Sequence, residues 1–179
     1  MKPIKSFCLA LALGISLPAD ALPSDDMFEA LSEAPSPAHA EALEEDILAA
    51  LLESGSPTAD LLMERALLAE KAQAYDLMRE LLDRIVLIEP DFSEAWFRRA
   101  RLFLAEQSLD QAIFDLDQAL TAEPRHFRAW FTLGQVFAQL GQNQEALEAY
   151  REAVNIHPHY APALSEIKRL VPLVEGRAI

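Results

Sequence analysis

The feature that most limits how this chain can fold is a block of sequence that occurs twice in succession, in residues 93–124 and 127–158. When the two copies are aligned, the same kinds of residue occupy matching positions: a tryptophan, a second aromatic residue, three small residues and a closing proline. These candidate core positions are Trp96, Ala100, Phe103, Ala112, Ala119 and Pro124 in the first copy, and Trp130, Gly134, Phe137, Ala146, Ala153 and Pro158 in the second, which adds Tyr150. A weaker copy lies upstream, so the chain is expected to repeat one unit three times.

The spacing within a copy predicts two helices. Trp96, Ala100 and Phe103 recur at i, i+4 and i+7, which places them on one face of a helix. Ala112 and Ala119 mark the facing stripe of a second helix, and small residues there allow the two backbones to approach closely. The proline ends each unit because it cannot continue a helix beyond its first turn. A unit of this size cannot bury both of its faces alone, so neighbouring units are expected to stack.

This pattern resembles the tetratricopeptide repeat. The resemblance implies an all-α, right-handed solenoid of three helix pairs in a repeat domain at residues 59–174, with repeats at about 59–92, 93–126 and 127–160. An amphipathic helix at 161–174 is expected to cap the last repeat, with Leu164, Ile167 and Val171 on its apolar side, and residues 175–179 form a tail. Gly141 is expected to supply the left-handed turn between the last two helices.

Residues 22–58 are predicted to be a helical extension that does not match the repeat. Ser36 before Pro37 has the spacing of a helix N-cap, and Gly55-Ser56-Pro57 ends this helix and starts the next in the same way. We expect the helix from Pro37 to about Glu53 to cover the open edge of the first repeat as a degenerate half-repeat. The alternative is a mobile arm that binds another protein.

Residues 1–21 have the order of a secretory signal peptide. Two lysines lie in residues 1–5, an apolar run follows in 7–17, and Ala19-Asp20-Ala21 has the small residues of a cleavage site. We expect cleavage after Ala21 and a periplasmic or secreted location. A retained anchor is the weaker alternative, because the apolar run is too short to span a bilayer and no stable membrane insertion is expected.

Charge and composition argue against several functions. The formal net charge is −14, which disfavours nucleic acid as a partner because phosphate binding needs a basic surface. The sequence has no glycine-rich phosphate loop, no nucleophile beside a base and no zinc spacing, so no catalytic residue, metal or cofactor is expected. His157 and His159 flank Pro158, and we interpret them as part of a solvated turn in preference to a metal site.

The resemblance also implies where a partner would bind. In tetratricopeptide arrays the first helix of each pair lines a concave face that receives a peptide. The residues expected there are Phe97, Arg98, Arg101, Arg128, Phe131 and Gln135. Arginine forks suit carboxylates and phenylalanine suits apolar side chains, which indicates a partner with an acidic and hydrophobic segment. The carboxylate clamp of some family members does not carry over, since only Arg128 keeps a charge at its positions.

Two alternatives remain open. The arginines of this region could pair with Glu94, Glu123 and the acidic helices beside them, and so contribute little to binding. Asp91 and Glu94 themselves have capping-box spacing at a helix start.

The expected function is a non-enzymatic adaptor or assembly factor of the cell envelope. The alternative is a structural protein that self-associates through a repeat edge, and a metal-binding or hydrolytic enzyme is a third interpretation.

Overall fold

A computed structural model describes residues 23–176, so the predicted signal peptide and residues 177–179 of the predicted tail lie outside the described range. All regular secondary structure in this range is α-helical. The helices are α1 (Asp25–Ser32), α2 (Pro37–Ala50), α3 (Pro57–Lys71), α4 (Tyr75–Ile88), α5 (Ser93–Ala105), α6 (Leu109–Ala122), α7 (Phe127–Gln139), α8 (Asn143–Ile156) and α9 (Ala161–Val174). The all-α fold predicted from the repeat is therefore confirmed.

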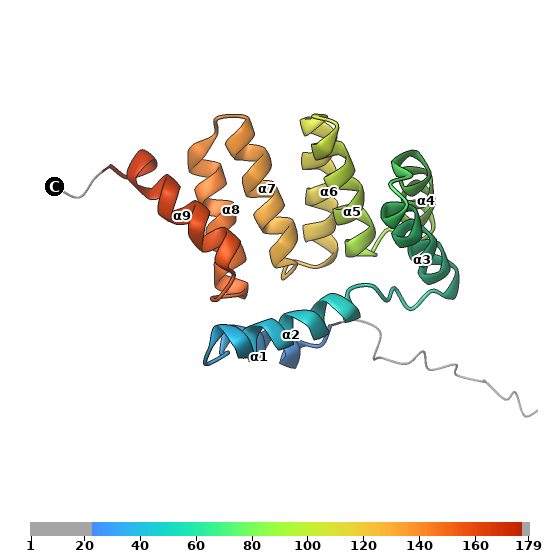
Figure 1. Ribbon diagram of the computed structural model, residues 1–179, viewed down its shortest axis with the longest axis horizontal. Coiled ribbons are helices and arrows are strands. Elements are labelled where there is room, and N and C mark those ends of the chain that lie inside the picture. The colour runs from blue at the N-terminus through green and yellow to red at the C-terminus, as the bar shows by residue number, and fades with distance from the viewer. Residues whose placement is uncertain (1–22, 177–179) are drawn as a thin grey trace, which may run out of the picture.

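Three antiparallel helix pairs stack side by side, α3 with α4, α5 with α6 and α7 with α8, and α9 follows the last pair (Figure 1). The turns within the pairs lie at one end of the stack, and the turns that join one pair to the next lie at the other end. The second helix of each pair packs against the first helix of the next, as α4 does on α5 and α6 on α7. This is the arrangement of an α-solenoid.

The repeated tryptophans tie each first helix to the turn before it. The indole N–H of Trp96 donates to the carbonyl oxygen of Pro90 at 2.7 Å, and that of Trp130 donates to Pro124 at 2.8 Å. Trp96 is buried against Phe114, whereas Trp130 is only partly buried. Packing thus differs between two positions that the sequence pattern makes equivalent.

The turn within each pair needs a residue in the left-handed conformation. Gln73, Gln107 and Gly141 hold the same position in successive repeats and have φ angles of 57°, 58° and 74°. The backbone N–H of the following residue closes each turn, for example from Gln142 to the carbonyl of Phe137 at 2.9 Å. Glycine supplies this conformation without steric cost only in the last pair.

Helix starts in the N-terminal extension agree with the sequence in one place and differ in another. The Ser36 side chain accepts a hydrogen bond from the backbone N–H of His39, as an N-cap should. The Ser56 side chain makes no such bond at the start of α3. Asp60 instead accepts from the backbone N–H and hydroxyl of Ser54, at 2.8 and 2.6 Å, and so fixes the turn before the helix.

Helices α1 and α2 lie across the end of the stack that carries the turns between pairs (Figure 1). Nε2 of His157 lies 3.0 Å from Oε2 of Glu44, and Nε2 of His159 lies 2.9 Å from the carbonyl oxygen of Ala34. The guanidinium carbon of Arg125 lies over the ring of Phe28, 4.3 Å from the ring centre. The expectation that α2 covers the open edge of the first repeat is therefore wrong, because its partners are in the third repeat and the turn after it.

The closing helix α9 packs through two of the three predicted residues, Ile167 and Val171, which lie partly buried against the apolar cluster of the last repeat. Ala163 and Leu170 are fully buried against the last repeat, whereas Leu164 is exposed. Ala163 and Leu170 occupy the positions that Ala129 and Val136 hold one repeat earlier, so α9 packs as the first helix of a fourth unit. Within residues 23–176, no helix combines the length and the apolar character needed to cross a membrane.

Candidate peptide-binding surface

Phe97 forms the floor of the surface predicted on α5 and α7. Its side chain is 1% exposed, and its ring centre lies 4.7 Å from that of the His126 imidazole. The guanidinium groups of Arg101 and Arg128 lie 5.9 and 5.4 Å from the centre of the same ring. The sequence predicts direct contact of Phe97 with a partner, but the structure buries it and leaves its ring as a support for two arginines.

A buried polar network lies beside this ring. Glu94 and His126 are both buried, and Nε2 of His126 lies 3.1 Å from Oε2 of Glu94. The backbone N–H of Ala129 donates to Nδ1 of His126 at 3.2 Å, so the hydrogen that His126 donates to Glu94 is on Nε2. Glu94 therefore does not form the predicted capping box at the start of α5, and its carboxylate holds α7 against α5 instead.

Charge neighbours keep Glu94 ionised inside the protein. Burial alone would raise its pKa, but the hydrogen bond from His126 and the charges of Arg98 and Arg128 hold the pKa below its ordinary value of 4.5. Nε of Arg98 lies 2.6 Å from Oε1 of Glu94. The carboxylate is thus a structural counter-charge for the arginines around it.

Residues 98–128 contain five arginines, and three of them, Arg98, Arg99 and Arg125, are held by carboxylates of the protein itself. Arg98 is 11% exposed and also donates to Glu70 at 2.9 Å, so it is not free to bind a partner as predicted. The ion pairs of the other two are Arg99 with Asp115 and Asp83, and Arg125 with Glu123 and Asp25. For these three side chains, the alternative of internal pairing is the one that the structure supports.

Arg101 and Arg128 remain available at the surface. The Arg101 side chain is 43% exposed, and its nearest carboxylate oxygen, on Glu70, lies 3.7 Å away. Arg128 is partly exposed and has no carboxylate within ion-pair distance among residues 23–176. Two guanidinium groups on one aromatic ring, of which only that of Arg101 has a loose carboxylate partner among the described residues, form a local positive surface on an acidic protein.

The third repeat adds aromatic rings to the same side. Phe131 is partly buried, and its ring centre lies 5.4 Å from that of Tyr150 and 5.5 Å from that of Tyr160. Burial raises the pKa of the Tyr160 phenol, and the nearby charges of Arg128 and Arg101 partly oppose this change. Gln135, one turn further along α7, is partly exposed. The structure therefore gathers Arg101, Arg128, Phe131 and Tyr160 near one another.

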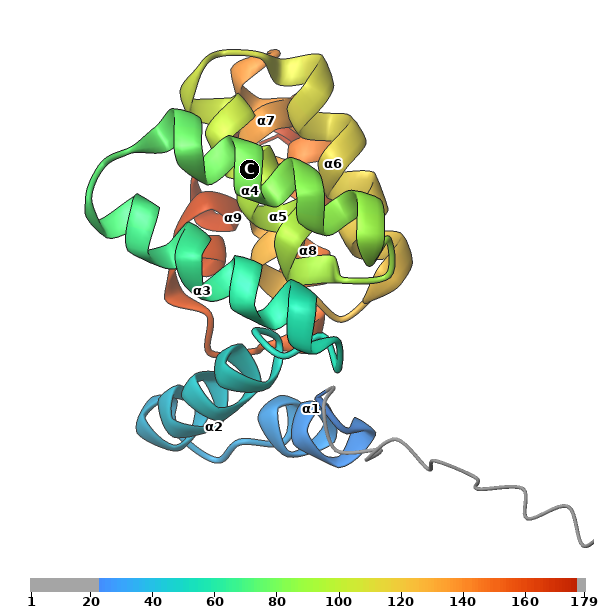
Figure 2. The same cartoon turned by 90° about the vertical axis from the view of Figure 1, so that its right-hand side faces the viewer.

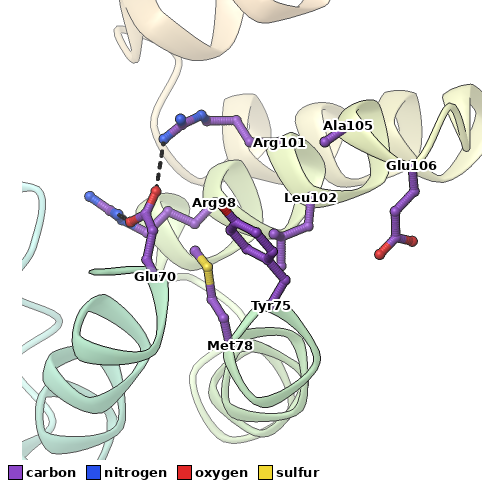
Figure 3. A pocket seen from close by; sticks show the side chains of 8 residues that line it. All are labelled: Glu70, Tyr75, Met78, Arg98, Arg101, Leu102, Ala105 and Glu106. Carbon is purple, nitrogen blue, oxygen red and sulfur yellow. Dashed lines mark hydrogen bonds and ion pairs between the residues drawn. The ribbon is translucent and has the colours of Figure 1, made fainter. Parts of the chain in front are cut away.

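A cavity of about 400 Å³ opens next to Arg101, between the first repeat and α5 (Figure 3). Met78, Tyr75 and Leu102 give it an apolar lining. Arg98, Arg101 and Glu70 lie at one end, and Glu106 lies at the other. Glu106 is held there by two 2.8 Å hydrogen bonds from Arg79. The cavity is thus an apolar recess with a charged rim.

The sequence does not indicate this cavity. Met78 on α4 and Leu102 on α5 are ordinary apolar residues of amphipathic helices, and the next helix usually covers such residues. The recess depends on how the first repeat and α5 are placed relative to one another, and no local sequence pattern encodes that placement. The exposed Tyr75 at the start of α4 is the one residue whose type could have marked an open rim.

The two histidines around Pro158 serve the N-terminal helices. Each uses Nε2 on a group of the extension, Glu44 for His157 and the Ala34 carbonyl for His159. His157 is buried in contact with the rings of Phe127 and Tyr160. The solvated turn expected from the sequence is therefore a docking contact. Among the described residues, no group of three His, Cys, Asp or Glu side chains is placed to hold a metal ion.

Comparison with known proteins finds similar sequences and similar folds. Residues 97–161 match the sequence profile of the tetratricopeptide repeat. A TPR repeat-containing protein of Rhizobium etli is 28% identical over 152 residues, which cover 85% of this chain and 74% of that protein.

Solved structures with the same fold include two whose descriptions mention peptide binding. One is the first TPR of Spaghetti (RPAP3) bound to the HSP90 peptide SRMEEVD, with a TM-score of 0.63 and 18% identity over 67% of this chain and 95% of that one. Another is YrrB, a TPR protein with an unusual peptide-binding site, with a TM-score of 0.57 and 25% identity over 74% of this chain and 66% of that one. Residues 97–161 therefore match the tetratricopeptide repeat profile, and the stacked helix pairs have a fold similar to that of these solved structures.

Proposed function

We propose that this protein is a non-enzymatic binding module that holds a peptide segment of a partner protein. The segment has acidic side chains, which meet Arg101 and Arg128, and an apolar side chain, which enters the recess beside Tyr75 and Leu102. The observation that carries the proposal is the pair of guanidinium groups above the buried ring of Phe97. Among the described residues, Arg101 has only the loose partner Glu70, and Arg128 has no carboxylate within ion-pair distance.

The chemistry of the surface supports this partner class. A guanidinium presents a planar fork of N–H donors that fits a carboxylate, and the ring below it restricts its motion. The recess of about 400 Å³ is large enough for one apolar side chain. The HSP90 peptide bound by the RPAP3 domain, SRMEEVD, combines acidic and apolar residues in the same way.

The test is selection from a phage-displayed library of random peptides against the purified protein. Selected peptides are expected to carry acidic residues next to a leucine, methionine or phenylalanine. The Arg101→Gln, Arg128→Gln double variant should lose their binding, whereas Arg84→Gln, on the outer side of α4, should keep it. Glutamine avoids placing a new negative charge beside Glu94. Equal binding by the double variant would contradict the proposal.

We also propose that the protein works in the cell envelope after export. This rests on the lysines, the apolar run and the small residues within residues 1–21, which have the order of a signal peptide. Cell fractionation with N-terminal sequencing of the mature protein tests it, and a chain that begins at Met1 and stays in the cytoplasm would contradict it.

A further inference from the structure

The outward face of α3 carries four residues that form one stripe, Leu61, Glu64, Arg65 and Leu68, at i, i+3, i+4 and i+7. Their counterparts in the next repeat, on α5, are Ala95, Arg98, Arg99 and Leu102. Three of these counterparts contact the preceding repeat. Arg98 pairs with Glu70, Arg99 pairs with Asp83, and Leu102 lines the recess beside Met78. The stripe therefore occupies positions that pack against a neighbour elsewhere in the stack.

The positions equivalent to Leu61 and Leu68 in the later repeats are all buried, and each such series of equivalent positions is called a column below. The residues after Leu61 in its column are Ala95, Ala129 and Ala163, and those after Leu68 are Leu102, Val136 and Leu170, all of them buried. Leu61 is 48% exposed and Leu68 is 58% exposed. Figure 2 shows α3 and α4 at the front of the stack, with no described helix in front of them.

The charges between the two leucines also lack partners. Glu64 and Arg65 are exposed, and neither has an ion-pair partner among residues 23–176. The equivalent arginines of α5 each bridge to the preceding repeat. At this edge of the stack, both the apolar and the charged contacts of a repeat interface are thus left unmade.

The order of the four residues identifies what would complete them. The stripe reads the same in both directions about the midpoint between Glu64 and Arg65, apart from the sign of the charges. Two α3 helices packed antiparallel about a two-fold axis would place Leu61 on Leu68 of the second copy and Glu64 on Arg65 of the second copy. The leucine contact and the ion pair then each form twice, which is what a self-complementary two-fold interface requires.

We propose that two copies of this protein form a dimer through the stripe of Leu61, Glu64, Arg65 and Leu68 on α3. A helix of another protein would have to supply a leucine, an arginine, a glutamate and a second leucine in the same register. The second copy supplies them in that register without any further condition. This inference is independent of the proposed peptide-binding function, because Arg101 and Arg128 are on α5 and α7.

Charge exchange tests the dimer directly. Glu64→Arg places two arginines opposite two arginines, and Arg65→Glu places two glutamates opposite two glutamates, so each variant alone should sediment as a monomer. Mixing the two variants should restore a species of doubled mass, because each arginine then meets a glutamate of the other chain. The double variant Glu64→Arg, Arg65→Glu should dimerise like the wild type.

Two controls keep this experiment decisive. All changed side chains are exposed, so at a dilution where the wild type is monomeric its thermal midpoint should equal that of every variant. Lys168→Glu, on the exposed side of α9, should leave the dimer intact. A wild-type chain that stays monomeric at high concentration would overturn the proposal. So would a dimer that survives both single charge changes, or one that Lys168→Glu disrupts to the same extent.

Discussion

Gly134 and Tyr150 show how one residue pair adapts the repeat. A Cβ atom at Gly134 would lie 2.5 Å from the ring of Tyr150, and this ring is fully buried. In the preceding repeat the same two positions hold Ala100 and Leu116, also buried. The larger side chain of Tyr150 thus needs the smaller residue on the facing helix.

Gly134→Ala should therefore destabilise the protein through overpacking, by about 1–3 kcal/mol. In a Tyr150→Leu background the same change should cost much less, because leucine beside alanine is the pair already found in the second repeat. Urea unfolding of the four proteins of this double-mutant cycle measures the coupling. An equal cost in both backgrounds would mean that contact with the ring of Tyr150 is not what makes alanine unfavourable at this position.

Glu94 makes the stability of the fold depend on pH, and its lowered pKa determines the direction of that dependence. Its pKa is lowered in the folded state, so the unfolded chain takes up this proton at a higher pH than the folded chain does. The stability it contributes is therefore present above its ordinary pKa of 4.5, and is lost as the pH falls toward the folded value.

Glu94→Gln should thus lower the free energy of unfolding at neutral pH, and the difference from the wild type should narrow below about pH 4.5. Urea unfolding across this range measures it. Glu148→Gln, at an exposed position of α8, serves as the control and should run parallel to the wild type. A constant gap between Glu94→Gln and the wild type would show that the charge of Glu94 does not stabilise the fold.

At the scale of helices, α1 and α2 are held to the stack from one side. Leu31 is fully buried, and with Phe28 it joins the apolar cluster of Phe127 and Leu147. A segment without regular helix, residues 51–56, connects α2 to the first repeat and includes Gly55 in the left-handed conformation. We therefore expect the two helices to detach more easily than the repeats unfold.

Leu31→Ala should weaken this docking by about 2–5 kcal/mol. Cleavage by a protease within residues 51–56 should then become faster, and the repeats should keep their thermal midpoint. Glu29→Ala, an exposed position on the same helix, is the matched control. A lower midpoint for the whole chain would show instead that the extension and the repeats unfold as one unit.

At the scale of helices, the sequence predicts those features that depend on interactions between residues close together in the chain. The repeat period predicts the helix pairs because each pair is held by residues within or next to one repeat, such as Trp96 and the carbonyl of Pro90. The position of α2 depends on Glu44 and His157, which lie 113 residues apart, and no spacing rule links them. The partner of Glu94 is hidden for the same reason, since His126 lies 32 residues further along the chain.

At the scale of the whole molecule, the two proposed surfaces use different sides of α3. Glu70 lies at the recess, whereas Glu64 lies on the outward stripe, six positions earlier. At about 100° per residue, these two side chains point about 120° apart around the helix. A dimer built on the stripe therefore leaves Arg101 and Arg128 open to a peptide in each copy.

Peptide binding and self-association should thus be independent. Glu64→Arg should bind selected peptides with the wild-type affinity while it sediments as a monomer, and Arg101→Gln with Arg128→Gln should dimerise normally while it loses the peptides. Titration calorimetry should give one peptide per chain in both the monomeric variant and the wild type. Dissociation of the wild-type dimer by added peptide would show that the two surfaces are coupled through α3, because an occupant of the recess would then have to shift the helix that carries the stripe.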